Sequence, residues 1–187
     1  MDRSKTDSIQ SRFGVSLVAS IIRGGVSFAT GLLLARWLGT EDYGRMAFLL
    51  ASFIAFKQFL DMASSSAFFT FLSQRRRSKQ FITFYWIWIG IQFLFSLLIV
   101  GFLLPDSMID IVWEGESRLI VVLALVAVFM QHNVWPSASQ MAEAQRETIR
   151  VQSLNLLVVM IHLVVVAALW LVGQLLLPLL FIAVVVE

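Results

Sequence analysis

Long apolar runs with almost no charge constrain the fold of this chain more than any other feature. Five such runs are long enough, as helices, to cross about 30 Å of hydrocarbon, and they lie at 13–38, 43–72, 81–104, 119–142 and 151–172. A sixth run, 175–186, is shorter, and we interpret it as a truncated span. A bilayer offers backbone groups no hydrogen-bond partners, so spanning runs of this kind form helices. We therefore expect an all-α, polytopic transmembrane helix bundle that forms a single region over residues 1–187.

The overall composition supports a membrane class. Hydrophobic residues make up 59% of the chain and charged residues only 14%, and the mean hydropathy is +0.84. A soluble domain cannot bury so large an apolar fraction. The chain has no cysteine, which excludes disulfides and thiolate metal sites.

Basic residues alternate between the connecting segments and indicate the topology. Cytoplasmic segments are enriched in lysine and arginine, and the segments that carry them here hold Arg3, Lys5 and Arg12, then Arg75, Arg76, Arg77 and Lys79, then Arg146 and Arg150. The 105–118 segment is instead acidic, and we expect it to be a solvated outside loop that binds no metal. The pattern predicts a cytoplasmic N-terminus, and we interpret the basic run at 74–79 as a topology signal with no role in nucleic-acid binding.

The first predicted span carries a polar stripe along one helix face. The stripe consists of Ser16, Ser20, Arg23, Ser27 and Thr30, spaced three or four residues apart. Small and hydroxyl residues of this kind commonly line close helix–helix contacts in membranes. Arg23 fits that interpretation less well, because it lies about 15 Å from the cytoplasmic end of the span. A buried partner or a wet cavity explains it better.

The second predicted span contains Lys57 and Asp61, one helical turn apart. Asp61 lies about 17 Å from the cytoplasmic end of its span, at a depth similar to that of Arg23. The three charges are therefore expected to form a group with one surplus positive charge, which favours an anionic ligand. The alternative is that Lys57 and Asp61 neutralise each other while Arg23 reaches the interface.

The fourth predicted span has a polar centre. Gln131, His132 and Asn133 are consecutive and are soon followed by Pro136. Proline cannot complete the regular helical hydrogen-bond ladder, so we expect a hinge or an unwound segment there. These residues, with Ser20 and Ser27, are weaker candidates for lining a cavity.

The connection between the first two spans predicts a tight helical hairpin. Gly39 is suited to ending one helix by adopting a left-handed conformation, and Thr40 is suited to capping the next. Glu41 and Asp42 would then lie at the positive end of that helix.

Several short motifs, in order, resemble the polysaccharide exporter and O-antigen flippase family, part of the multidrug, oligosaccharidyl-lipid and polysaccharide exporter superfamily. They are Arg23-Gly24-Gly25, the segment 35–39, Tyr43-Gly44, and the segment 141–146 leading through Arg150 to Asn155. Members have two pseudo-symmetric lobes, and this chain corresponds to most of the first, so a second lobe or a partner subunit is expected.

The resemblance implies a protein of the bacterial inner membrane that acts in polysaccharide or lipopolysaccharide synthesis. The expected substrate is a polyprenyl-pyrophosphate-linked saccharide, moved by alternating access. Arg23 and Lys57 would attract its anionic head group, and Asp61 would hold them between substrates.

Other classes fit the sequence less well. There is no phosphate-binding glycine loop, nucleophile elbow, or metal-ligand spacing. We therefore expect neither catalysis nor a cofactor. A non-transporting assembly subunit stays open as an alternative, with a membrane-embedded glycan-processing enzyme less favoured.

Overall fold

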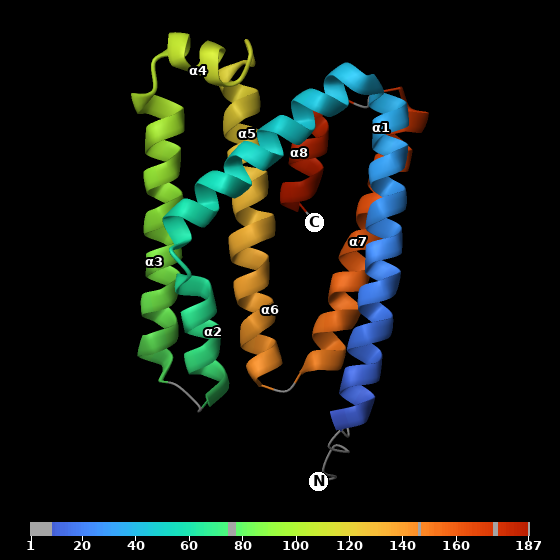
Figure 1. The fold of residues 1–187 in the computed structure, drawn as a ribbon, viewed down its shortest axis with the longest axis vertical. Coiled ribbons are helices and arrows are strands. Elements are labelled where there is room, and N and C mark those ends of the chain that lie inside the picture. Colours follow the sequence, from blue (N-terminus) through green and yellow to red (C-terminus); the bar gives the residue numbers. More distant parts are fainter. Residues whose placement is uncertain (1–8, 75–77, 146, 174–175, 187) are drawn as a thin grey trace.

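The computed structural model describes residues 9–74, 78–145, 147–173 and 176–186, and within these residues the chain is helical with no strand. The helices are α1 (Ile9–Asp61), α2 (Ser64–Gln74), α3 (Lys79–Leu98), α4 (Asp106–Val112), α5 (Arg118–Phe129), α6 (Trp135–Ala144), α7 (Thr148–Leu171) and α8 (Leu177–Val186). Two π-helical turns interrupt the α-helical pattern, η1 (Ile99–Leu103) and η2 (Met130–Val134). The first extends α3, and the second joins α5 to α6 in one continuous rod (Figure 1).

Four helical segments among the described residues are long and apolar enough to cross a membrane. They are Phe13–Asp61, Lys79–Leu103, Arg118–Ala144 and Thr148–Leu171. The last three agree closely with the runs expected at 81–104, 119–142 and 151–172. Many large apolar side chains on these helices are exposed, including Phe102 and Leu171. Such surfaces suit a lipid environment. The all-helical class is confirmed, with four helices long and apolar enough to span a membrane where the sequence predicts five full spans.

The first of these segments reverses direction at Gly39. This residue has φ 80° and ψ 172° inside the otherwise helical α1. A positive φ strains a residue that carries a side chain, but glycine adopts it readily. The helix break expected at Gly39 is confirmed, although its ψ is extended and not that of a left-handed helix. The bend divides α1 into an N-terminal limb, residues 9–38, and a C-terminal limb, residues 40–61.

The run predicted at 43–72 is not one continuous helix, which corrects the sequence-based expectation. Met62 and Ala63 have φ values of 43° and 63°, so α1 ends at Asp61 and α2 begins at Ser64. Neither glycine nor proline occurs at this break, so the usual sequence signals of a helix end are missing. The conformation is instead held by side chains, as described below.

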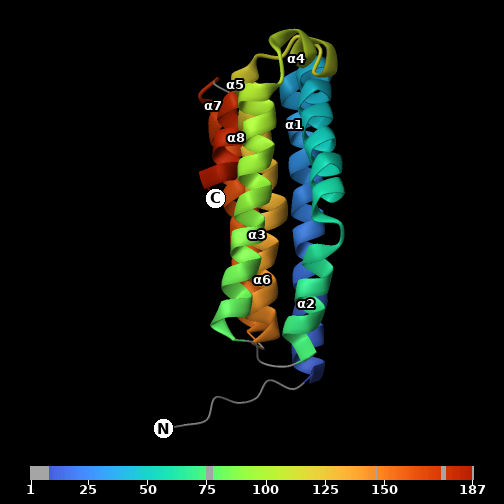
Figure 2. The same ribbon diagram turned by 90° about the vertical axis from the view of Figure 1, so that its left-hand side faces the viewer.

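The helices form two layers (Figure 2). Both limbs of α1 and α2 make one layer, and α3 and α5 to α8 make the other, with α4 across one end of the bundle. The N-terminal limb runs beside α7, while the C-terminal limb crosses toward α3 (Figure 1). The main core lies between the C-terminal limb, α5 and α8, and its fully buried side chains include Leu49, Phe53, Val121, Val128 and Phe181.

The end of the bundle covered by α4 is tied to the core by an aromatic residue. Trp113 follows α4 and stacks on Phe53 at a centroid distance of 5.5 Å. Its indole Nε1 donates a hydrogen bond of 3.1 Å to Ser52 Oγ. A tryptophan with one apolar face and one satisfied polar atom suits this position. The contact fixes the 105–118 segment against α1.

Candidate functional site

Asp61 stabilises the break between α1 and α2. Its Oδ1 accepts hydrogen bonds from Ser64 Oγ at 2.7 Å, from Ser65 Oγ at 2.7 Å and from the Ser65 backbone N–H at 3.2 Å. A carboxylate that accepts from the first turn of a helix caps its unpaired N–H groups and favours its positive end. Asp61 therefore acts as the cap of α2 and shapes the segment that follows Lys57.

Two side chains of α3 also stabilise the break between α1 and α2. Gln92 Nε2 donates to the Leu60 carbonyl at 3.3 Å, and Trp88 Nε1 donates to Ser64 Oγ at 3.2 Å. Leu60 is in the last turn of α1, where carbonyls lack helical partners. The two side chains of α3 thus bond to both sides of the break. The Leu60 carbonyl and the Ser65 N–H, which flank the break, thus find side-chain partners inside the protein, as a membrane environment favours.

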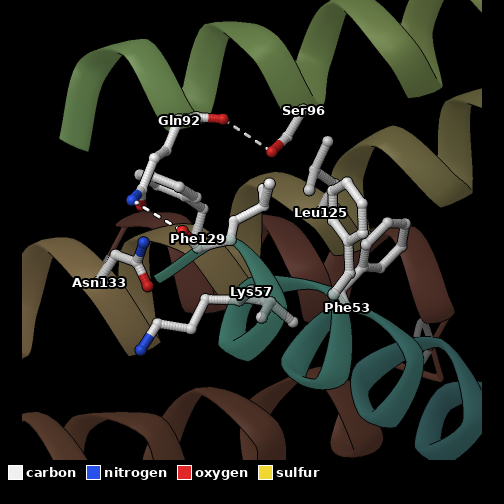
Figure 3. Close-up of a pocket in the computed structure, with 10 residues that line it drawn as sticks. Phe53, Lys57, Gln92, Ser96, Leu125, Phe129 and Asn133 are labelled. Carbon is white, nitrogen blue, oxygen red and sulfur yellow. Dashed lines mark hydrogen bonds between the residues drawn. The ribbon is translucent and has the colours of Figure 1, made fainter. Parts of the chain in front are cut away.

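Lys57 lies one turn before Asp61 and lines a small cavity (Figure 3). The cavity has a volume of about 10 Å³, and its walls come from the C-terminal limb of α1, α3, α5 and η2. Its polar lining residues are Lys57, Gln92, Ser96 and Asn133, and the rest of the wall is apolar. Lys57 is half-buried and takes part in none of the ion pairs formed among the described residues.

The polar centre predicted in the fourth span forms η2. Trp135 donates its backbone N–H to the Met130 carbonyl, five residues earlier, which widens the helix by one residue. Pro136 follows directly and has no N–H to donate to the His132 carbonyl. The predicted irregularity is present, as a π-turn and not as an unwound segment. Gln131 is exposed and His132 is half-buried, while Asn133 is buried and lines the Lys57 cavity.

Arg23 lies on the N-terminal limb of α1, whereas Lys57 and Asp61 lie on the C-terminal limb. Its guanidinium donates a hydrogen bond of 3.5 Å to Ser20 Oγ, and no ion pair joins it to another described residue. Ser20 and Ser27 are exposed. A Cβ atom added at Gly24 would have no neighbour within 4 Å. The described helices thus leave this part of the polar stripe uncovered, and no ion pair joins Arg23 to Asp61.

A polar contact outside the cavity was not expected from the sequence. Glu116 is only 3% exposed, and its Oε1 accepts a hydrogen bond of 2.6 Å from Arg45 Nε. The expectation of a fully solvated acidic loop is therefore wrong for Glu116, because the loop folds back over α1. Asp106, which is 86% exposed, agrees with that expectation.

Sequence reasoning also missed Gln92 and Ser96. Both are buried in α3, where Ser96 Oγ donates to the Gln92 carbonyl at 2.7 Å. They lie four residues apart in an otherwise apolar span, so a polar pair on one helix face was the available signal. No group of three or more potential metal ligands occurs in the part of the chain that the structure describes.

Comparison with known proteins identifies no family for this chain. The sequence matches no protein-family model, no curated protein and no solved structure. The fold is that of an all-helical protein with four helices long and apolar enough to span a membrane, in which Lys57 and three other polar side chains line a small, mostly apolar cavity.

Proposed function

We propose that this chain is a region of a bacterial inner-membrane transporter that translocates a lipid-linked, anionic saccharide by alternating access. Lys57 carries the proposal. It is a half-buried cation without an ion-pair partner among the described residues, inside an otherwise apolar bundle. Charged side chains are costly at membrane depth, and those retained there commonly mark substrate or ion pathways.

The chemistry of Lys57 and Arg23 suits a pyrophosphate head group. An ammonium and a guanidinium both form charge-assisted hydrogen bonds with phosphate oxygens, and the planar guanidinium binds two oxygens at once. Arg23 bonds only to Ser20 among the described residues, so most of its donors stay available. Asp61 is occupied by Ser64 and Ser65, and we assign it the role of shaping the Lys57 segment and not of contacting substrate.

Two irregular segments adjoin Lys57 and supply a means of movement. The break at Met62 and Ala63 follows it on the same chain segment, and η2 carries Asn133 on the opposite wall of the cavity. Helix discontinuities at membrane depth are where transporters commonly bind substrate and bend. The proposal places the cavity at this junction and the moving parts on either side of it.

The topology that goes with this proposal has the N-terminus in the cytoplasm. The two limbs of α1 then cross the membrane separately, the second together with α2, and α8 is a partial span. The proposed arrangement has five crossings, because the first of the four candidate spans is bent at Gly39 and counts as two, and it would correspond to most of one lobe. A second lobe or a partner subunit would complete the transport path.

The test is translocation of a labelled polyprenyl-pyrophosphate oligosaccharide in proteoliposomes that contain the full-length protein. We expect Lys57→Ala to reduce the rate about tenfold or more, because a charge-assisted hydrogen bond is worth about 1.5–3 kcal/mol. Lys79→Ala is the matched control, since Lys79 is an exposed residue at the start of α3. Normal transport by a correctly inserted Lys57→Ala variant would refute the proposal.

An assembly subunit is the second candidate, and the uncovered stripe on the N-terminal limb favours it. Ser20, Gly24 and Ser27 are exposed, and small residues of this kind allow close helix packing in membranes. The chain has no cysteine, so a Ser27→Cys variant reports on this face alone. Formation of a disulfide-linked dimer in native membranes, without any loss of transport in Lys57→Ala, would favour assembly over transport.

A further inference from the structure

Asn133 has an unsatisfied polar atom inside the bundle. The side chain is 4% exposed, and its Oδ1 has no hydrogen-bond partner among the described residues. A buried polar atom left without a partner costs about 1–3 kcal/mol. In folded proteins such atoms are nearly always paired with protein or with ordered water. The position of Asn133 on the cavity wall identifies where its partner would lie (Figure 3).

The cavity meets the requirements for a bound water molecule. Its volume of about 10 Å³ is close to the smallest space that holds one water, which also needs at least two polar partners. Asn133 Oδ1 offers an acceptor. Lys57 offers donors, and Gln92 Nε2 has a second hydrogen besides the one that it donates to Leu60. Both residues line the same cavity.

The combination of one acceptor with nearby donors discriminates between ligands. In this conformation an anion would pair with Lys57 but would leave the carboxamide oxygen of Asn133 without a donor. An apolar group would leave Oδ1 unsatisfied. Water satisfies both sides, since it donates to Asn133 and accepts from Lys57 or Gln92.

We infer that the cavity lined by Lys57, Gln92, Ser96 and Asn133 binds at least one ordered water, which donates to Asn133 Oδ1 and hydrates the charge of Lys57. This water site does not depend on the proposed transport function. It explains how a lysine without an ion-pair partner among the described residues is accommodated at membrane depth, because charged side chains there pair with one another or face water.

Silver-ion accessibility tests the inference, because silver reacts with the thiolate, which apolar surroundings disfavour and water stabilises. Val128 and Val121 form a matched pair on α5, 1% and 0% exposed, but only Val128 lines the cavity. Each is changed to cysteine in the cysteine-free chain, in membranes. The fraction of thiol blocked by Ag⁺ is measured by later alkylation in denaturant, and the thermal midpoints of both variants are checked first.

We expect Val128→Cys to react about tenfold faster with Ag⁺ than Val121→Cys. Adding Asn133→Leu, which removes the acceptor with little change in size, should slow Val128→Cys toward the Val121→Cys rate. Equal rates for the two cysteines, slow or fast, would overturn the inference, as would a rate that Asn133→Leu leaves unchanged. If Val128→Cys misfolds, Ser96→Cys replaces it, since Ser96 is 1% exposed and lines the same cavity.

Discussion

Removal of Arg45 should destabilise the protein far more than its exposed position suggests. Its partner Glu116 is 3% exposed, and the contact of 2.6 Å between Arg45 Nε and Glu116 Oε1 is short. Glu116 Oε2 has no partner among the described residues, so Arg45 provides the main compensation for the buried carboxylate. Breaking a buried pair from one side leaves an uncompensated charge, which is more costly than the pair itself is stabilising.

The expected loss follows from the burial of the two partners. Removing one member of a buried pair costs about 3–5 kcal/mol. Arg45 is 40% exposed, so water reaches the pair from that side, and we expect about 2–3 kcal/mol for Arg45→Ala. Arg45 also contacts Asp42 at 3.1 Å, but water reaches both side chains, which are 40% and 48% exposed. That second pair contributes about 0.5 kcal/mol or less.

The assay is the free energy of unfolding in mixed micelles, followed by tryptophan fluorescence during a titration with denaturing detergent. Asp42→Ala is the control that removes only the exposed pair. Glu116→Gln neutralises the buried charge, so adding it to Arg45→Ala should recover about 2 kcal/mol. If Arg45→Ala and Asp42→Ala lose the same amount, or if Glu116→Gln gives no recovery, the reasoning about the buried carboxylate is refuted.

Three further predictions use the same unfolding measurement. Arg118 donates to the carbonyls of Val100, Gly101 and Leu104 at the end of η1, so Arg118→Ala should cost about 2–4 kcal/mol. Asp106 forms an ion pair with Arg118 but is 86% exposed, so Asp106→Ala should cost less than about 1 kcal/mol. Equal losses for the two variants would contradict a role of Arg118 in binding these carbonyls. Gly39→Ala should cost about 1–3 kcal/mol, because φ there is 80°. Gly44 is the control, because it is helical and has open space for a Cβ atom, so Gly44→Ala should be neutral or stabilising by up to about 1 kcal/mol. Similar effects of the two substitutions would exclude backbone strain at Gly39. Asp61→Ala should cost about 1 kcal/mol through loss of the α2 cap, and Asp61→Asn should retain most of that stability. If Asp61→Ala leaves the free energy of unfolding unchanged, Asp61 does not stabilise α2 as a cap.

Part of the candidate site could be predicted from the sequence. Lys57 and Asn133 stand out as polar residues in apolar runs, and both line the same cavity in the structure. Pro136 correctly indicated a helical irregularity, because a missing N–H is a local property of one residue. The grouping of Arg23 with Lys57 and Asp61 stays a prediction, because equal depth in a membrane does not establish which helices are neighbours.

The sequence by itself determined the all-helical class and the approximate ends of three of the four long apolar helices. Apolar length and charge spacing act locally, and in lipid the backbone must form helices wherever such a run spans the bilayer. Tertiary structure decided the break at Met62 and Ala63, because Asp61, Trp88 and Gln92 hold it through contacts with residues up to 32 positions away. It also decided the burial of Glu116, which is paired with a residue 71 positions away. A carboxylate has the same sequence signature whether water or a neighbouring helix surrounds it, so only the packing of the chain distinguishes the two.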